Sequence, residues 1–143
     1  MSEFLKIEDA ALLEKYLIDF EVCFPHLKEK VNINEFAIKL AKYAENYIML
    51  ECGKPIGITC FNANDSENFC GYITLIGIMP QTQKGGFGKQ LMFFTLAKMQ
   101  EKGMKKAKLE VDSDNINAQG FYYHLGFENE KENEKSLYLV REI

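Results

Sequence analysis

The chain has 143 residues, of which 47% are hydrophobic and 27% charged, the size and composition of one ordinary folded domain. Its 17 Lys and Arg against 21 Asp and Glu give a net charge of −4, which argues against a general nucleic-acid binder and favours a cationic or amine-bearing partner. No apolar run approaches the roughly 20 residues that span a bilayer, and the first seven residues lack signal-peptide features. We therefore expect a single domain over residues 1–143, with no membrane segment.

The cysteines show no CxxC pattern and no short Cys/His spacing, so we expect no metal site. They are Cys23, Cys52, Cys60 and Cys70, and the two histidines, His26 and His124, stand far apart in the sequence. Four reduced thiols indicate a cytoplasmic protein. Neither Cys60 nor Cys70 has an adjacent basic residue to lower its pKa, so neither is a good candidate for an acyl-carrying nucleophile.

The N-terminal part predicts one short strand and two helices. Residues 4–7 suit the strand, and Glu8 and Asp9 suit the first turn of a helix, where carboxylates meet unpaired N–H groups. Apolar residues then repeat at helical spacing, at Leu13, Tyr16, Leu17 and Phe20. Residues 21–31 have no regular pattern. Asn34 is the expected N-cap of the second helix.

After Asn46 the hydrophobic period changes to that of strands. The run 72–78 is apolar almost without alternation, as expected of a strand that is covered on both faces. Gly77 within it indicates a bulge or the close approach of another chain. The expected segments are a strand at 47–51, a turn at 52–55, a strand at 56–61, a loop at 62–68 and a strand at 72–78.

The C-terminal half predicts a long helix at 87–102 that ends at Gly103, followed by a strand at 107–111. In this strand Leu109 and Val111 share one face, and Lys108 and Glu110 share the other. A short helix at 118–124 and a hairpin of 127–130 with 137–140 complete the chain. The order of elements predicts a mixed α/β or α+β sheet domain.

The glycine-rich turn before the long helix is the most informative segment. Gly85, Gly86 and Gly88 let the backbone fold tightly and bring N–H groups together at the positive end of a helix dipole. Phosphate is the natural ligand of such a turn, and Lys84 and Lys89 add positive charge. A turn with no ligand is the structural alternative.

Two common phosphate-binding patterns are absent from this turn. The Walker motif needs Ser or Thr after its lysine, but Lys89 is followed by Gln90. A dinucleotide fingerprint needs a third glycine where Leu91 stands, and the chain is short for a doubly wound nucleotide domain.

Two motifs resemble those of the GCN5-related N-acetyltransferases (GNAT). The first is a Gln or Arg, two residues, Gly, one residue and Gly or Ala, which here reads Gln83-Lys-Gly-Gly86-Phe-Gly88. The second is Asn115-Ile-Asn-Ala118-Gln-Gly-Phe121-Tyr122-Tyr-His-Leu-Gly126-Phe127. Together with the order of elements, the resemblance covers residues 4–143.

The resemblance implies the acyl-CoA N-acyltransferase fold, a mixed and mostly antiparallel sheet with helices on both faces and strands splayed at the cofactor site. It also implies acetyl-CoA as the acetyl donor, with no metal. The pyrophosphate would contact the turn, the pantetheine arm would run along the central strand, and Asn115, or alternatively Asn117, would bond that arm. The implied cofactor-binding residues are Ile76, Gly77, Ile78, Gln83, Lys84, Gly85, Gly86, Phe87, Gly88, Lys89 and Asn115.

By the same resemblance Tyr122 matches the general acid of the family, since a phenol with a pKa near ~10 stays protonated at pH 7. Glu110 lies twelve residues before it, where some members, including bacterial ribosomal-protein-alanine acetyltransferases, place a general base. The alternatives for these two residues are a packed aromatic and a solvated charge beside Lys108. Glu51 and Glu67 stay open as other bases.

The function that these residues indicate is transfer of acetyl from acetyl-CoA to a primary amine, directly within a ternary complex. The alternatives are a non-catalytic acyl-CoA-binding or regulatory module of the same fold and a phosphate-binding interaction domain. The acceptor is open among a small molecule, a peptide N-terminus and a lysine side chain. The C-terminal hairpin is a candidate pairing surface for a homodimer.

Overall fold

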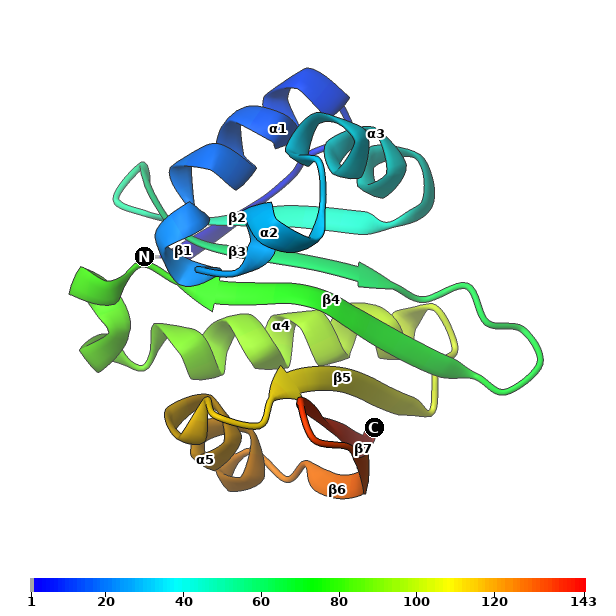
Figure 1. Cartoon of the computed structure of the whole chain (residues 1–143). Helices are drawn as coiled ribbons and strands as arrows, with labels where there is room; N and C mark the ends of the chain where they lie inside the picture. Colours follow the sequence, from blue (N-terminus) through cyan, green and yellow to red (C-terminus); the bar gives the residue numbers. More distant parts are fainter. Residues whose placement is uncertain (1) are drawn as a thin grey trace. The chain divides into compact units, whose positions relative to one another are not determined.

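The computed structural model describes residues 2–143 and contains seven strands and five α-helices in that range (Figure 1). In chain order they are β1 (Ser2–Lys6), α1 (Ala10–Asp19), the 3-10 turn η1 (Glu21–Cys23), α2 (Leu27–Lys30), α3 (Ile33–Tyr43), β2 (Glu45–Glu51), β3 (Lys54–Asn62), β4 (Cys70–Ile78), the 3-10 turn η2 (Pro80–Gly85), α4 (Phe87–Glu101), β5 (Lys106–Asp112), α5 (Ile116–His124), β6 (Glu128–Glu132) and β7 (Ser136–Glu142).

The strands form a mixed sheet in the order β1-β2-β3-β4-β5-β7-β6. The β4–β5 pair is parallel, and the β1–β2, β2–β3, β5–β7 and β6–β7 pairs are antiparallel, which confirms the mostly antiparallel sheet. By its contacts the chain forms two compact units. The first holds the residues up to Phe61 and Leu75–Thr95, and the second holds Asn62–Thr74 and Leu96–Ile143.

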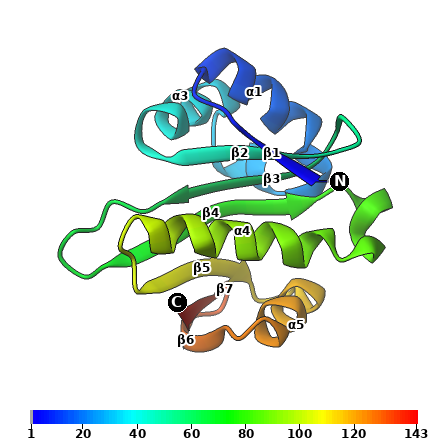
Figure 2. The ribbon, with the colours of Figure 1, turned by 180° about the vertical axis from the view of Figure 1, so that it is seen from behind.

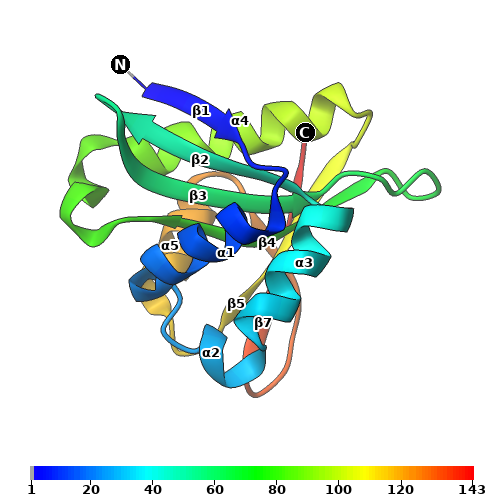
Figure 3. The same cartoon turned by 90° about the horizontal axis from the view of Figure 1, so that it is seen from above.

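In the first unit, helices cover both faces of the strands, as Figures 2 and 3 show for α1 and α3 on one side and the start of α4 on the other. Ile48 of β2 and Ile58 of β3 belong to the core that packs against α1 and α3. Met49 belongs to a second core with Leu91 of α4. The expected stripe of α1 is confirmed, because Leu13, Leu17 and Phe20 are buried.

Two helix starts differ from the sequence prediction by one or two residues. Asp9 is the N-cap of α1 and accepts a hydrogen bond from Leu12 N at 2.9 Å, rather than lying inside the first turn. Asn32, not Asn34, caps α3 by accepting from Glu35 N at 3.0 Å. Asn34 instead donates to Glu14 of α1 at 2.8 Å. Both asparagines suit the role, so composition alone does not choose between them.

The segment 21–31 is more ordered than its sequence predicts, since it contains η1 and the short helix α2. Neither piece contains a buried residue or a side-chain cap. Their turns are closed by backbone bonds such as Cys23 N to Phe20 O at 2.9 Å and Leu27 N to Phe24 O at 3.0 Å. With so few positions, no hydrophobic period develops, which explains why neither piece could be predicted from the sequence.

In the second unit, β4 pairs with β5 over Cys70–Ile73, opposite Lys106–Leu109. Beyond these pairs β5 continues to Asp112 and stays paired with β7 (Figure 1). The expected face pattern of β5 is confirmed, because Leu109 and Val111 are buried and Glu110 is exposed. The expectation that β4 is covered on both faces is wrong at Tyr72, whose side chain is 38% exposed.

Candidate active site

The glycine-rich turn lies in the first unit, where η2 leads directly into α4. Gly86 adopts the left-handed conformation with φ of +75°, and nothing lies within 4 Å of where its Cβ would be. Gly85 is equally constrained, because a Cβ there would lie 2.6 Å from the ring of Phe87. The sequence prediction of a tight turn that requires glycine is therefore confirmed.

The N-terminus of α4 differs from those of the other long helices in its capping. Asp9, Asn32 and Asn115 each cap their helix with a side-chain oxygen. Gly86 precedes α4 and has no side chain with which to do so. The N–H groups in the first turn of a helix have no intrahelical carbonyl partner, so this end of α4 presents donors and positive potential to an anion.

The side chain of Gln83 folds back onto the end of β4 and does not point away from the turn. Its Nε2 donates to Ile78 O at 3.1 Å, and Cys23 Sγ donates to the same carbonyl at 3.4 Å. Lys84 and Lys89 are exposed, and Lys89 Nζ lies 5.9 Å from the ring centroid of Phe93. Gln83 therefore holds the turn in place, while both lysines remain accessible.

Gly77 is explained by packing within the first unit. A Cβ at this position would lie 3.0 Å from Cys23 Cβ and 3.0 Å from Phe24 Cζ, so the missing side chain makes room for the segment after α1. The sequence argument that Gly77 leaves space for a ligand therefore loses its physical basis. Ile76 is half-buried, and Ile78 packs in the core with Leu91.

Replacing Gly77 with alanine is expected to lower the free energy of unfolding by about 1–3 kcal/mol, because the new methyl overpacks against Cys23 and Phe24. The control is Gly120→Ala on α5, where nothing lies within 4 Å and a gain of about 0.5–1 kcal/mol is expected. Urea unfolding measures both. Adding Phe24→Leu should recover part of the loss, and equal stability of the two alanine variants would contradict the packing explanation.

In the second unit, Asn115 caps α5 by accepting from Ala118 N at 3.2 Å. The start of α5 is therefore two residues earlier than the sequence predicts. The side chain of Asn115 is exposed, as is that of Asn117. Its Oδ1 serves the helix, and its amide nitrogen is the group that could donate to a ligand.

Tyr122 lies on α5, with its ring in edge-to-face contact with Phe121 and Phe127 at centroid distances of 5.6 and 5.9 Å. Burial raises the pKa of the Tyr122 phenol to about 12. Within residues 2–143, no hydrogen-bond partner is present for its hydroxyl. The aromatic contacts thus hold the Tyr122 ring in place. Its hydroxyl stays protonated at neutral pH and is available to donate a hydrogen bond.

Glu110 extends from the exposed face of β5, and its carboxylate is fixed by one short bond. Ser136 Oγ donates to Glu110 Oε2 at 2.6 Å. Ser136 is buried, and its N–H donates to Asn133 Oδ1 at 2.9 Å in the β6–β7 turn. Lys108, on the same face of β5, does not pair with Glu110, because Lys108 Nζ lies 3.0 Å from Glu130 Oε1.

Gln119 ties α5 to the end of β5. This buried side chain donates from Nε2 to Asp112 O and Ser113 O, both at 3.0 Å. Ser113 in turn donates from its N–H to Lys135 O at 2.8 Å, which attaches the β6–β7 turn (Figure 1). The strand with Glu110, the helix with Tyr122 and the hairpin with Ser136 are therefore one bonded frame.

Replacing Gln119 with leucine is expected to lower the free energy of unfolding by about 1–3 kcal/mol, because two carbonyl groups lose their buried donor. The exposed Gln100 of α4 provides the control, and Gln100→Leu should change stability by less than about 0.5 kcal/mol. Denaturant unfolding monitored by circular dichroism measures both. Equal changes in the free energy of unfolding for the two variants would contradict a role of Gln119 in holding the bonded frame together.

The four cysteines are free thiols. Burial raises the pKa of Cys60 and of Cys70, and it raises that of Cys23 to about 11. Each shift lowers the thiolate fraction, which weakens the case for a cysteine nucleophile. The described residues contain no group of three or more His, Cys, Asp and Glu side chains placed to hold a metal ion.

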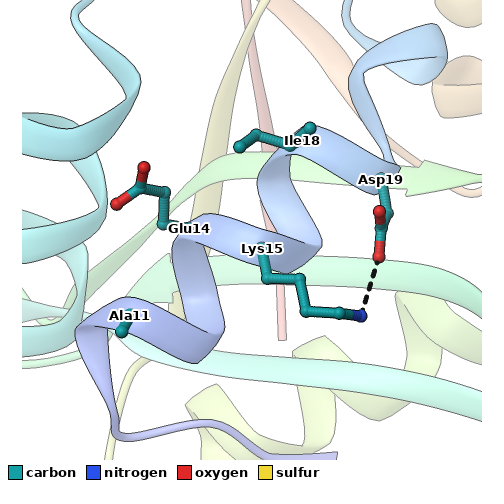
Figure 4. Close-up of a pocket in the computed structure, with 5 residues that line it drawn as sticks. All are labelled: Ala11, Glu14, Lys15, Ile18 and Asp19. Atoms are coloured by element: carbon teal, nitrogen blue, oxygen red, sulfur yellow. Dashed lines mark hydrogen bonds and ion pairs between the residues drawn. The ribbon is translucent and has the colours of Figure 1, made fainter.

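Other surface features do not coincide with these residues. Figure 4 shows an open hollow along α1 that is lined by Ala11, Glu14, Lys15, Ile18 and Asp19. Lys15 and Asp19 are paired there at 3.1 Å, one helical turn apart. Within residues 2–143, no helix is long and apolar enough to cross a membrane.

A family model, that of the Acetyltransferase (GNAT) family, matches residues 10–127. The chain belongs to the GNAT family. The matched range contains the glycine turn as well as Glu110 and Tyr122.

Known acetyltransferases resemble this chain in part or over its whole length. Mycothiol acetyltransferase of Streptomyces coelicolor is 40% identical over 62 residues, which cover 43% of this chain and 20% of that protein. The chain spans about a fifth of the length of the curated relatives it matches.

Two solved structures share the fold at low identity. The ribosomal-protein-S18-alanine N-acetyltransferase of Escherichia coli has a TM-score of 0.80 and 18% identity, covering 100% of this chain and 94% of that one. The PaiA N-acetyltransferase of Thermoplasma acidophilum, solved in complex with coenzyme A, has a TM-score of 0.77 and 16% identity, covering 100% and 99%. The expected acyl-CoA N-acyltransferase fold is confirmed.

Sequence reasoning missed the residues that surround Glu110 and Tyr122. Gln119 lies inside the second GNAT motif but at a position that the motif does not specify. Ser136 and Tyr138 fell within or beside a predicted hairpin whose register the sequence does not define. Tyr72 is the first residue of the apolar run 72–78, and the pattern of that run held no signal that its side chain is exposed.

Proposed function

We propose that this GNAT protein transfers an acetyl group from acetyl-CoA to a primary amine, directly in a ternary complex. The observation that carries the proposal is the left-handed Gly86 at the N-terminus of α4, where no side chain competes for the helical N–H groups. Family membership and the unpartnered phenol of Tyr122 support it.

The residues present fit a diphosphate. In the proposal the N–H groups of 84–89 bind it, with Lys84 and Lys89 adding charge that is free to reorient at the surface. The backbone of Ile76, Gly77 and Ile78 and the amide nitrogen of Asn115 bind the pantetheine arm. The carbonyl of Ile78 already accepts two bonds from side chains of the chain itself, so it is not the group offered to that arm.

Acetyl-CoA supplies an activated thioester when bound. Glu110 accepts a proton from the acceptor's ammonium, directly or through water, and the freed amine lone pair attacks the acetyl carbon. The C–N bond forms as the C–S bond breaks, and Tyr122 donates its hydroxyl proton to the departing sulfur. The new amide nitrogen then loses its second proton, which returns through water to the Tyr122 oxygen. The raised pKa of Tyr122 keeps that proton in place at neutral pH.

Thiol release tests this function directly. The full chain is incubated with acetyl-CoA and a panel of butylamine, spermidine, a peptide with a free N-terminus and an N-blocked peptide that contains lysine. Release of free coenzyme A with at least one amine is expected. Binding of acetyl-CoA without release for any amine would favour the alternative, a non-catalytic acyl-CoA-binding module, and absence of binding would reject both.

Several broader features belong to the same proposal. The whole of 1–143 acts as one acetyltransferase domain, and its free thiols favour the cytoplasm. The acceptor is a small molecule, a peptide N-terminus or a lysine side chain. A homodimer through the C-terminal hairpin stays a prediction, against which stands the wholly exposed β6, with three glutamates in five residues.

A further inference from the structure

The exposed face of the sheet in the second unit places three chemically related side chains together. Glu110 of β5 lies directly opposite Tyr138 of β7, and Tyr72 of β4 lies opposite Lys108, two residues along β5. Side chains two apart on a strand share a face, so all three stand on the same side. Diagonal neighbours across strands are within reach of aromatic side chains. Glu110 is thus flanked by a tyrosine from each neighbouring strand.

The two tyrosines are electrostatically close to the carboxylate. Burial raises the pKa of the Tyr72 phenol, and the negative charge of the Glu110 carboxylate raises it further. Tyr72 nevertheless remains 38% exposed, and Tyr138 is half-buried. The rings therefore border a carboxylate at a surface that a ligand can reach.

Glu110 carries an unbalanced negative charge in this cluster. Its neighbour Lys108 is paired with Glu130, and within residues 2–143 no cation lies in salt-bridge distance of the Glu110 carboxylate. The 2.6 Å bond from buried Ser136 Oγ fixes one carboxylate oxygen of Glu110, whose side chain is otherwise exposed. A fixed carboxylate that lacks a cation but has aromatic flanks is the arrangement that binds an ammonium ion.

The Tyr138 ring already attracts an ammonium within the chain. Lys131 Nζ of β6 lies 5.0 Å from its centroid, a cation–π contact. Because β6 is exposed over its whole length, this lysine is free to move away when another cation arrives. The contact shows that the ring face is open to an alkylammonium group.

We propose that Glu110, Tyr72 and Tyr138 form an ammonium-binding subsite, with Ser136 as a positioning residue, that selects a cationic alkylamine as the acetyl acceptor. The inference rests on the proposed function in treating the bound amine as the acetyl acceptor. Binding of an ammonium ion at these residues does not itself depend on turnover. Glu110 supplies the charge, the tyrosine rings supply cation–π attraction, and Ser136 fixes the carboxylate orientation.

A matched pair of probes tests the subsite without acetyl transfer. Choline carries a quaternary ammonium that cannot be acetylated on nitrogen, and 3,3-dimethyl-1-butanol is its neutral isostere. The full chain is titrated with each, and the ring-proton NMR signals of Tyr72 and Tyr138 are followed, assigned through Tyr72→Phe and Tyr138→Phe. We expect both signals to shift with choline, saturating at millimolar concentration, and not with the alcohol.

Variants separate the contributions of the residues. Glu110→Gln and Tyr138→Leu should each weaken choline binding roughly two- to fivefold, whereas Tyr138→Phe, which keeps the ring, should bind like the wild type. Lys131→Gln should tighten binding, because it removes the resident ammonium. Thermal melts confirm that each variant is folded.

Equal shifts with choline and the alcohol, or no shift with either, would overturn the subsite. So would unchanged choline affinity in folded Glu110→Gln and Tyr138→Leu variants. Failure of the proposed function has a different outcome, namely choline binding at these tyrosines with no release of coenzyme A for any amine tested.

Discussion

Replacing Tyr122 with phenylalanine is expected to lower kcat about 100-fold while acetyl-CoA affinity changes less than about twofold. The substitution removes only the hydroxyl, so the edge-to-face contacts with Phe121 and Phe127 remain. Without the phenol, the thiolate leaves with no positioned proton donor. Steady-state release of coenzyme A with the best acceptor measures kcat, and calorimetric titration measures the donor affinity.

Tyr123→Phe is the matched control, because Tyr123 follows directly on α5 but is 42% exposed. Its kcat should stay within about twofold of the wild type. The pH dependence adds a second check. Since burial raises the pKa of Tyr122 to about 12, ionisation of this acid should not lower kcat until the pH comes within about one unit of that value. An unaffected rate in Tyr122→Phe would remove this residue from the mechanism.

The second large effect is expected for Gly86→Asp, which should weaken acetyl-CoA binding by about tenfold to 100-fold. The added carboxylate places negative charge beside the N–H groups at the start of α4, where the diphosphate is proposed to bind. The space around Gly86 is open, since a Cβ added there would have no atom of the protein within 4 Å. Titration of the folded variant with acetyl-CoA measures the loss.

Gly53→Asp is the control for the loss of stability caused by placing aspartate at a backbone position with positive φ. Gly53 lies in the β2–β3 turn with φ of +76°, almost the value of Gly86, and its Cβ position is equally open. Both substitutions should therefore lower stability by a similar amount, on the order of 1 kcal/mol, while only Gly86→Asp lowers donor affinity. A comparable loss of affinity in both variants, or in neither, would contradict a phosphate site at this turn.

The amino-acid sequence determines the local features of this chain. Glycines at 86, 103 and 126 mark positions with positive φ, and the apolar spacing of α1 and α4 marks their buried faces. These features depend on steric rules within a few residues, so they can be read before any fold is known. The two GNAT motifs could be recognised for the same reason, since each is a short run whose residues are defined by their spacing along one continuous stretch of backbone.

Sequence reasoning was weaker where a residue's role depends on a partner far along the chain. Gly77 suggested room for a ligand, but the residues that fill this room, Cys23 and Phe24, come from a segment with no readable pattern. Glu110 was placed on the correct face of its strand, yet its hydrogen bond comes from Ser136, 26 residues away. Strand alternation gives the face of a residue but not the register of the neighbouring strand.

The sequence by itself thus determined the family, most of the order of elements and the tight glycine turn before α4, and it supplied two catalytic candidates that stay predictions. Only the tertiary structure decided what surrounds Glu110. Ser136 donates a hydrogen bond to its carboxylate, and Tyr138 lies opposite it on β7. Tyr72 lies diagonally across on β4, and Lys108 is paired with Glu130. The physical reason is that β-sheet partners are chosen by the packing of the whole core, whereas turns and caps are chosen by the residues that form them.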